Sequence, residues 1–285
     1  MRRVRIRRRE EAVAGALEGD EVVLDGGDRI PAAEADWLAP VERPSKILAT
    51  HLSYRSRVAE YRMDAPPAAP SYFMKPPSSI SHHGAEVARP RGCRFLNYEG
   101  EIAVVIGERA HGVTPEDALG CVRGYTVAND FGVHDFRHAD RGSMLRVKGQ
   151  DGFCPLGPAL VDAGDIDPDA LELRTYVNGE VVQEAVAGED MLFGFGYQIA
   201  DLARLITLEP GDVILTGTPA NSRPVEPGDV VEVEVSGIGR LRNEITEADH
   251  ELNGPGEMPA VSAQTLHVAL AIPEDEAEAR AAAPR

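Results

Sequence analysis

The sequence has no excess of positive charge, no closely spaced cysteine pair and no long apolar run. Its 285 residues include 29 Lys and Arg against 47 Asp and Glu, which gives a formal net charge of -18. Nucleic acids and anionic membrane surfaces are poor partners for such a chain, because both are polyanions. We therefore expect no nucleic-acid partner and no membrane partner. A small anionic substrate remains compatible, because a local group of arginines can reverse the field.

The three cysteines, Cys93, Cys121 and Cys154, form no C-x-x-C pair. This spacing favours reduced thiols over a disulfide framework or a zinc site. The first nine residues, MRRVRIRRR, hold six arginines, but no apolar stretch follows as in a signal peptide. Their alternation favours a strand with Val4 and Ile6 turned inward. No run approaches the length of a membrane span, and we expect a soluble, cytoplasmic protein.

The sequence also lacks G-x-G-x-x-G and P-loop motifs, and its strand signals do not alternate regularly with helices. A doubly wound dinucleotide-binding sheet is therefore a poor fit. The best helix pattern is GYQIADLARLITL, residues 196–208, and a short helix is expected after Thr114. We expect a hairpin turn at 178–180 and Pro-Gly-Asp turns at 210–212 and 227–229. The sequence predicts an α+β fold that is mainly β.

Composition suggests three parts along the chain. Residues 1–45 are expected to form a small N-terminal accessory unit, rich in β-strand, with a helix-like stretch at 31–39. Residues 46–250 would be the catalytic domain, in which the 45–85 segment contains a Pro- and Ser-rich loop typical of a lid. Residues 251–285 form an acidic tail for which we favour disorder over a loose helix.

Two glutamates, Glu99 and Glu101, stand at the start of the apolar run in FLNYEGEIAVVIG. In a strand they share one face, and two such charges persist together if a proton or a cation lies between them. A solvated strand end is the alternative. Asp130 ends the strand-like GYTVAND, where an Asp is also a common turn residue. Three carboxylates without clustered His or Cys suit Mg²⁺ or Mn²⁺ and leave positions for water and substrate.

The segment after Asp130 concentrates positive charge in an acidic chain. Residues 131–148 carry Arg137, Arg141, Arg146 and Lys148. A solvated face with mixed charges is one interpretation. The other is a set of cations that bind substrate carboxylates, for which the planar guanidinium of Arg is well suited.

The segments NYEGEIAVVIG, GYTVAND, VKGQDGFCPLGP and GDVILTGTPA occur in this order within residues 45–245. Together they resemble the fumarylacetoacetate hydrolase family. The resemblance implies a mixed β-roll or sandwich, a homodimer, and one divalent metal held by Glu99, Glu101 and Asp130. It also implies that Lys148 contacts the substrate's oxo-acid end and that Thr218 binds its carboxylate.

One departure from the family pattern bears on the reaction. Hydrolytic members carry N-Y-x-x-H-x-x-E, in which His and Glu activate a water. The corresponding stretch here is SYRSRVAE, which places Arg57 at the His position and keeps Glu60. An Arg stays protonated and cannot act as a general base. A reaction without an activated water, such as decarboxylation or keto–enol isomerisation, is therefore favoured.

Within the family, THLSYRSRVAEYRM, PSYFMKPPSS and NDFGVHDFRHADRGSMLRVKGQDGF are most similar to the homoprotocatechuate meta-cleavage branch. That branch isomerises 2-hydroxyhepta-2,4-diene-1,7-dioate and decarboxylates 5-oxopent-3-ene-1,2,5-tricarboxylate. The resemblance implies a metal-dependent decarboxylase/isomerase of multiply carboxylated 2-oxo or 2-hydroxy-dienoic acids in aromatic catabolism. Its catalytic residues would be Lys148, Glu60 and Thr218. The distal carboxylates would be bound by Arg57, Arg137 and Arg141.

Two alternatives remain open from the sequence. A carbon–carbon bond hydrolase of acylpyruvate or fumarylpyruvate type would have to recruit another base, for which His82 or His83 is a candidate. A non-catalytic protein that binds metal and oxo acids is the second alternative.

Overall fold

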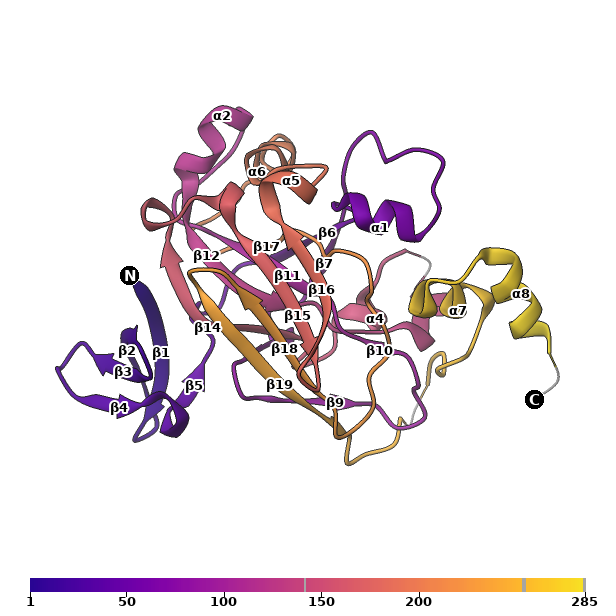
Figure 1. Cartoon of the computed structure of the whole chain (residues 1–285), viewed down its shortest axis with the longest axis horizontal. Helices are drawn as coiled ribbons and strands as arrows, with labels where there is room; N and C mark the ends of the chain where they lie inside the picture. The colour runs from indigo at the N-terminus through magenta and orange to yellow at the C-terminus, as the bar shows by residue number, and fades with distance from the viewer. Residues whose placement is uncertain (141, 253–254, 284–285) are drawn as a thin grey trace.

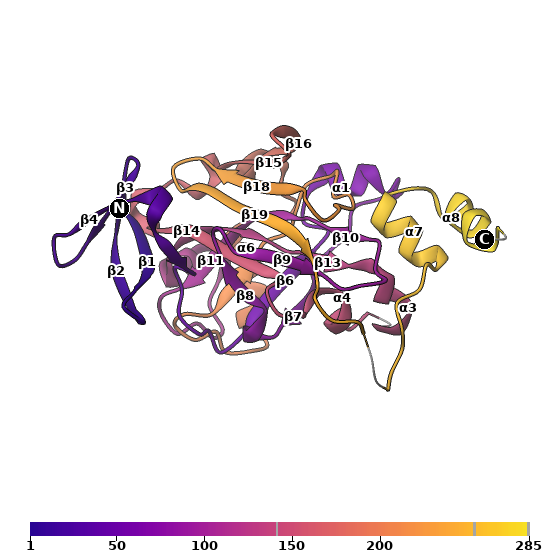
Figure 2. The ribbon, with the colours of Figure 1, turned by 90° about the horizontal axis from the view of Figure 1, so that it is seen from below.

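The computed structural model describes residues 1–140, 142–252 and 255–283. A β-rich N-terminal unit and two C-terminal helices lie at opposite ends of the long axis, and the main sheets lie between them (Figures 1 and 2). The expected α+β fold with mainly β structure is confirmed. Among the described residues, no helix is long and apolar enough to cross a membrane.

The largest sheet of the described residues contains twelve strands. Ten of them follow the order β4-β3-β2-β1-β14-β12-β11-β17-β6-β7, while β5 pairs with β1 and β8 with β14. Their bounds are β1 (Arg2–Arg8), β2 (Glu11–Glu18), β3 (Glu21–Leu24), β4 (Arg29–Pro31), β5 (Asp36–Leu38), β6 (Ile47–His51), β7 (Ser71–Lys75), β8 (Ile80–His82), β11 (Gly100–Ile106), β12 (Val122–Asn129), β14 (Cys154–Asp162) and β17 (Val213–Leu215).

A second sheet of the described residues has the order β16-β15-β18-β19-β9, and β10 pairs with β13. These strands are β9 (Glu86–Arg89), β10 (Leu96–Asn97), β13 (Gly132–Val133), β15 (Glu172–Val177), β16 (Glu180–Val186), β18 (Val230–Val235) and β19 (Gly239–Glu247). The α-helices are α1 (Arg55–Glu60), α2 (Pro115–Ala118), α3 (Arg137–Asp140), α4 (Leu145–Lys148), α5 (Ala187–Asp190), α6 (Phe195–Ala203), α7 (Ala263–Leu270) and α8 (Glu274–Ala282).

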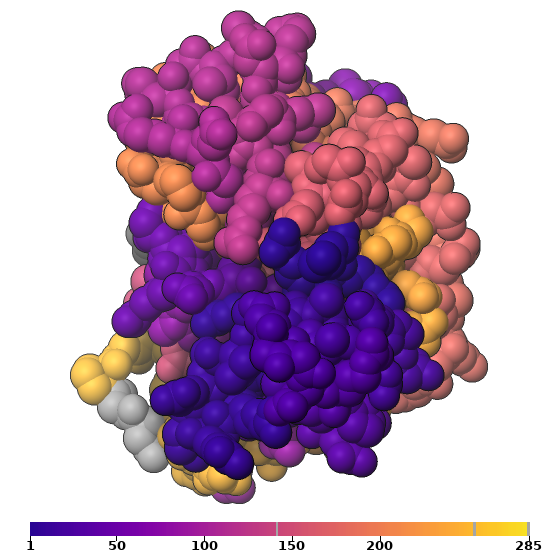
Figure 3. Space-filling view, turned by 90° about the vertical axis from the view of Figure 1, so that its left-hand side faces the viewer, coloured from indigo at the N-terminus to yellow at the C-terminus, as the bar shows by residue number. Residues whose placement is uncertain are grey.

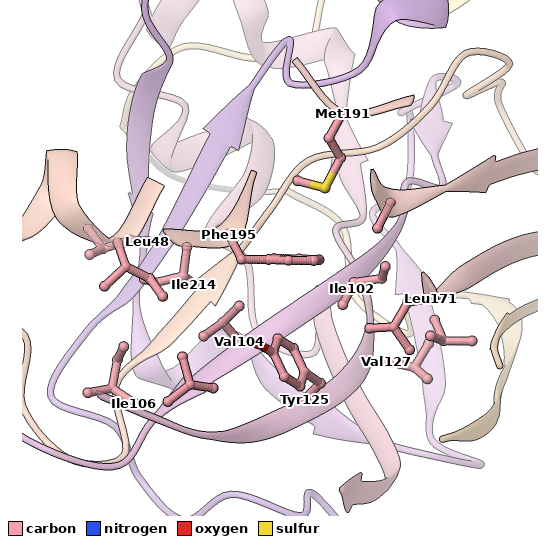
Figure 4. Close-up of a cluster of buried hydrophobic side chains, with 14 of the residues drawn as sticks. Leu48, Ile102, Val104, Ile106, Tyr125, Val127, Leu171, Met191, Phe195 and Ile214 are labelled. Carbon is pink, nitrogen blue, oxygen red and sulfur yellow. The ribbon is translucent and has the colours of Figure 1, made fainter. Parts of the chain in front are cut away.

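Strand β11 is buried on both faces, which explains its continuous apolar sequence. Ile102 and Val104 point into a cluster that includes Tyr125 of β12 and Phe195 of α6 (Figure 4). Ala103 belongs to a second cluster on the opposite face. Packing on both sides fixes β11, and with it the carboxylates at its start.

In the N-terminal unit the first strand forms as predicted, whereas the predicted helix does not. Val4 and Ile6 turn inward as expected and pack in a separate small cluster with Trp37. The helix-like stretch at 31–39 forms only a 3₁₀ turn followed by β5, because Trp37 pairs opposite Ile6 and its Nε1 donates a hydrogen bond to the Ala32 carbonyl. Strand β1 also pairs with β14, so the large sheet continues into this unit. In Figure 3 the unit, coloured indigo, covers a large part of the face toward the viewer. The boundary at residue 45 stays a prediction.

Local signals for turns and caps agree with the structure. Thr114 caps α2 by accepting a hydrogen bond from the Asp117 amide (3.3 Å). Asn178 and Gly179 both have positive φ between β15 and β16, as a tight hairpin requires. The two Pro-Gly-Asp turns precede β17 and β18. The helix expected over 196–208 is α6, which ends at Ala203.

The C-terminal region differs from the expected disordered tail, because it contains α7 and α8. Ser262 caps α7 by accepting a hydrogen bond from the Thr265 amide (3.1 Å), and Leu266 and Ala269 are buried. The average composition of residues 251–285 is dominated by the Ala- and Glu-rich residues at their end. It therefore does not reveal that α7, earlier in the same region, has apolar residues at helical spacing.

Replacing Gly100 should destabilise the fold, because a Cβ there would lie 2.1 Å from Oγ1 of Thr175 in the facing sheet. We expect Gly100→Ala to lower the free energy of unfolding by about 1–3 kcal/mol, measured by urea denaturation. Gly164→Ala is the matched control, since a Cβ there has no neighbour within 4 Å. Equal stability of the two variants would contradict the close approach of the sheets.

Candidate active site

A cavity of about 710 Å³ lies beside the start of β11. Its wall draws on segments that are far apart in the sequence, including α1, the ends of β6 and β12, and α7. Arg141 lies outside the described residues. All the other residues predicted for the site line this cavity: Arg57, Glu60, Glu99, Glu101, Asp130, Arg137, Lys148 and Thr218.

The three predicted metal ligands come together at one edge of the β11–β12 pair. These strands are antiparallel with Gly100 opposite Asn129, so the start of β11 meets the end of β12. One carboxylate oxygen each from Glu99, Glu101 and Asp130 lies within 4.8 Å of the other two. Strand pairing therefore explains how residues thirty positions apart form one acidic cluster.

Backbone hydrogen bonds fix this edge. The Asp130 amide donates to the Glu99 carbonyl (2.8 Å), and the Glu99 amide donates to Oδ1 of Asn129 (2.8 Å). The Gly217 amide donates to Oε2 of Glu101 (2.7 Å). Gly217 has φ +96, and a Cβ there would lie 1.9 Å from Oγ of Ser53, so only glycine fits. The TGTP segment after β17 thus supplies a donor to the cluster.

Two buried lysines compensate the negative charge. Nζ of Lys148 lies 2.6 Å from Oε2 of Glu99 and 2.9 Å from Oδ2 of Asp130, and it also donates to the Asp130 carbonyl (2.6 Å). Lys75 pairs with the other carboxylate oxygen of Asp130 and donates to the Phe153 carbonyl (2.9 Å). Sequence reasoning missed Lys75. The available signal was the alternation in SYFMK, which places Lys75 on the same inward face as Phe73.

Two carboxylates of the cluster, Glu101 and Asp130, have pKa values shifted in opposite directions. Burial, and then the charges of Asp130 and Glu99, raise the pKa of Glu101 well above its ordinary 4.5. Burial opposes ionisation of Asp130 as well, but Lys148 and Lys75 outweigh it and lower the Asp130 pKa below 3.8. Burial likewise opposes the charge of Lys148, but Asp130 and Glu99 outweigh it and raise its pKa. The site therefore opposes ionisation of Glu101 and favours ionisation of Asp130.

These donors fit a hard divalent cation. All three offer carboxylate oxygens, and Oε1 of Glu101 accepts no hydrogen bond from the described residues. A cation could stabilise the ionised form of Glu101, because ligation requires the ionised carboxylate. The cluster could thus hold a metal ion.

Helix α1 is tied to the acidic cluster through Arg57. Its guanidinium is buried and donates to Oε2 of Glu60 (2.8 Å) and to Oε1 of Glu99 (3.0 Å). Glu60 also pairs with Arg223 (2.7 Å) and accepts a hydrogen bond from the Asn221 amide (3.0 Å). Arg57 therefore already engages two protein carboxylates.

Arg137 is placed differently. Its Nε donates to Nδ1 of His134 (2.9 Å), and its guanidinium pairs with no carboxylate of the described residues. Burial lowers its pKa, but an arginine remains charged at neutral pH. Arg137 thus presents a positive charge at the cavity wall without a protein counter-ion among those residues.

A histidine that sequence reasoning did not single out also lines the cavity. His51 ends β6, and its Nδ1 lies 3.2 Å from Oγ of Ser71. Burial, and then the charge of Arg137, lower its pKa to about 4, so the ring is neutral at pH 7. His82 and His83 are not among the lining residues, and His83 packs against Trp37 instead (5.2 Å between ring centroids).

The fold and the cavity define a class of protein in which carboxylates at strand ends, buried lysines and arginines surround a cavity large enough for a small organic acid. The chain belongs to the fumarylacetoacetate hydrolase family, since residues 46–246 match the family model described as fumarylacetoacetate (FAA) hydrolase C-terminal. The resemblance seen in the sequence motifs is thereby confirmed.

Relatives and solved structures agree with this assignment. A 4-hydroxyphenylacetate degradation bifunctional isomerase/decarboxylase from Salmonella dublin is 39% identical over 82% of this chain, which spans 59% of that protein's length. A 5-carboxymethyl-2-hydroxymuconate delta-isomerase structure from Mycobacterium smegmatis is 35% identical, with TM-score 0.78 over 88% of this chain and 100% of that one. A maleylpyruvate hydrolase from Sphingobium sp. SYK-6, in complex with manganese(II) and pyruvate, is 27% identical, with TM-score 0.74 over 87% and 100%.

Binding of Mn²⁺ should strengthen as pH rises, because Glu101 has to lose its proton before it can ligate a cation. We expect the apparent Kd to fall by up to about tenfold per pH unit while the pH is below the raised pKa, and to level off above it. Electron paramagnetic resonance of free Mn²⁺ at a series of pH values measures this dependence.

Two variants complete the measurement. Glu101→Gln should bind Mn²⁺ weakly and without this pH dependence, whereas Glu108→Gln, at an exposed position, should behave like the wild type. Wild-type affinity in Glu101→Gln would show that Glu101 is not a ligand.

Proposed function

We propose that this chain is a divalent-metal-dependent decarboxylase/isomerase of multiply carboxylated 2-oxo or 2-hydroxy-dienoic acids in homoprotocatechuate meta-cleavage. The observation that carries the proposal is that one cavity contains both a three-carboxylate cluster and the guanidinium of Arg137, which pairs with no carboxylate among the described residues. The names of the relatives from Salmonella dublin and Mycobacterium smegmatis support the substrate class.

Glu99, Glu101 and Asp130 would hold the ion, which we propose to be Mg²⁺ or Mn²⁺. A bound ion would supply Lewis-acid stabilisation of the negative charge that develops on a 2-oxo acid when it enolises or loses CO₂. The manganese in the maleylpyruvate hydrolase structure supports this choice.

Lys148 and Thr218 would orient the oxo-acid end of the substrate. The ammonium group of Lys148 already contacts three oxygens of Glu99 and Asp130. To contact a substrate oxygen, it would have to give up one of these contacts. Oγ1 of Thr218 accepts a hydrogen bond from Nε2 of Gln183 (3.0 Å), which leaves its own proton available to a substrate carboxylate.

The arginines would bind the distal carboxylates. Arg137 needs no rearrangement to do so, whereas Arg57 would have to share or release Glu60 or Glu99. A role for Arg141 stays a prediction. We propose Glu60 as a proton carrier. To act in this way it would have to give up one of its three partners, which are Arg57, Arg223 and the Asn221 amide.

Family resemblance further supports a homodimer that acts in the cytoplasm, and both belong to this proposal. No other partner than the small acid is proposed.

A carbon–carbon bond hydrolase is the second candidate. The observation that favours it is the neutral ring of His51 in the cavity, because a neutral imidazole can accept a proton from water whereas Arg57 cannot. The similarity to maleylpyruvate hydrolase agrees with this alternative.

An assay with 5-oxopent-3-ene-1,2,5-tricarboxylate tests the proposed function. With Mg²⁺ or Mn²⁺ we expect CO₂ release and a change in diene absorbance, both abolished by EDTA. Glu101→Gln should lower kcat by roughly a hundredfold or more, because the charge stabilisation is lost. Glu108→Gln should retain activity.

The outcomes separate the candidates. A change in diene absorbance without CO₂ would indicate isomerisation alone. Cleavage of a 2,4-dioxo acid into two products, abolished in His51→Gln, would establish the hydrolase instead. Thermal stabilisation by metal and oxo acid with no product would point to a non-catalytic binder.

Arg137→Gln tests the distal-carboxylate role. We expect kcat/KM to fall by roughly ten- to a hundredfold for substrates with a distal carboxylate, mainly through KM, because a charge-assisted pair is lost. The same variant should turn over an analogue without that carboxylate almost normally. Arg109→Gln, at the exposed surface, is the control. An equal loss for both substrates would exclude this role.

A further inference from the structure

The C-terminal segment forms part of the cavity wall although it lies beyond the family domain. The family match ends at residue 246, whereas α7 and α8 lie within residues 263–282. Segment 262–274 nevertheless contributes five lining residues: His267, Val268, Ile272, Pro273 and Glu274.

This segment is attached to the site itself. Nδ2 of Asn97, two residues before Glu99, donates a hydrogen bond to the Ala269 carbonyl (2.9 Å). Oγ1 of Thr265 donates to the carbonyl of His134 (3.0 Å), whose ring holds Arg137. Both Asn97 and Thr265 are fully buried. Buried polar groups of this kind are costly to leave unpaired, so the segment completes the structure around the site.

Helix α7 packs against α3, which begins with Arg137 (Figure 2). The turn after α7 is held by His267, whose Nδ1 donates to the Ile272 carbonyl (2.7 Å), since a carbonyl oxygen can only accept. This bond fixes the turn that carries Ile272 and Pro273. Of the residues that this segment contributes to the wall, Val268, Ile272 and Pro273 are apolar, whereas His267 and Glu274 are polar.

We propose that residues 262–274 form a specificity-determining wall that sets the length of carbon chain accepted between the acidic cluster and Arg137. This inference rests on the proposed function, because it takes the oxo-acid end to lie at the cluster and the distal carboxylate at Arg137. An aliphatic wall contacts the uncharged carbon chain between these ends and selects by size. One methylene in such a pocket changes selectivity by roughly 10- to 200-fold.

Binding of a series of 2-oxo diacids tests the wall without any turnover. The Kd values of 2-oxoglutarate, 2-oxoadipate and 2-oxopimelate are measured by calorimetry with Mn²⁺-loaded full-length protein. Val268→Ala/Ile272→Ala should shift the ratio of affinities toward 2-oxopimelate by roughly tenfold, because the cavity gains length. Leu270→Ala is the matched control, since this half-buried residue of α7 does not line the cavity.

The proposal is overturned by an unchanged ratio in the double variant, by an equal shift in Leu270→Ala, or by wild-type protein that binds none of the three acids with Mn²⁺. Urea unfolding verifies that each variant is folded, and Ile272→Ala alone replaces the double variant if needed. Because no turnover is required, an absence of CO₂ release would contradict the proposed function and leave this measurement valid.

Discussion

Three carboxylates within 4.8 Å of one another, of which Glu101 and Asp130 are buried, are the constraint on which the rest of the structure depends. Such charges are not stable together unless cations or protons compensate them. Lys75 from β7, Lys148 from α4 and Arg57 from α1 converge on the cluster, and burial together with the neighbouring carboxylates raises the pKa of Glu101. The positions of these three elements around β11 follow from this requirement, as much as from apolar packing.

Much of this arrangement could be predicted from local sequence patterns. Alternation and turn residues predicted the strands, and alternation placed Glu99 and Glu101 on one face. Alternation in SYFMK places Lys75 on the inward face of β7, but this local pattern gives no reason to expect a buried charge there. Its importance depends on Asp130, which lies 55 residues away. The tail was misjudged for another reason: composition averaged over residues 251–285 concealed the apolar face of α7.

Sequence also could not distinguish between the arginines. Their number predicted an anionic substrate, but each side chain's role depends on long-range contacts. Arg57 is paired with Glu99, 42 positions away in the sequence. Among the residues that the structure describes, the Arg137 guanidinium hydrogen-bonds only to the ring of His134, three residues away. Arg57 therefore stabilises the site through ion pairs with protein carboxylates, whereas the positive charge of Arg137 is available to a ligand. Counting charges along a chain cannot separate these two uses.

The opposite placement of the N-terminal strands and the C-terminal helices has a practical consequence for handling the protein (Figure 1). An affinity tag or a surface linkage joined before β1 lies at the end of the molecule remote from α7. The same addition after α8 extends from the segment that completes the cavity wall, since Glu274 both begins α8 and lines the cavity. Fusion at the amino end therefore keeps the added segment away from this part of the cavity wall.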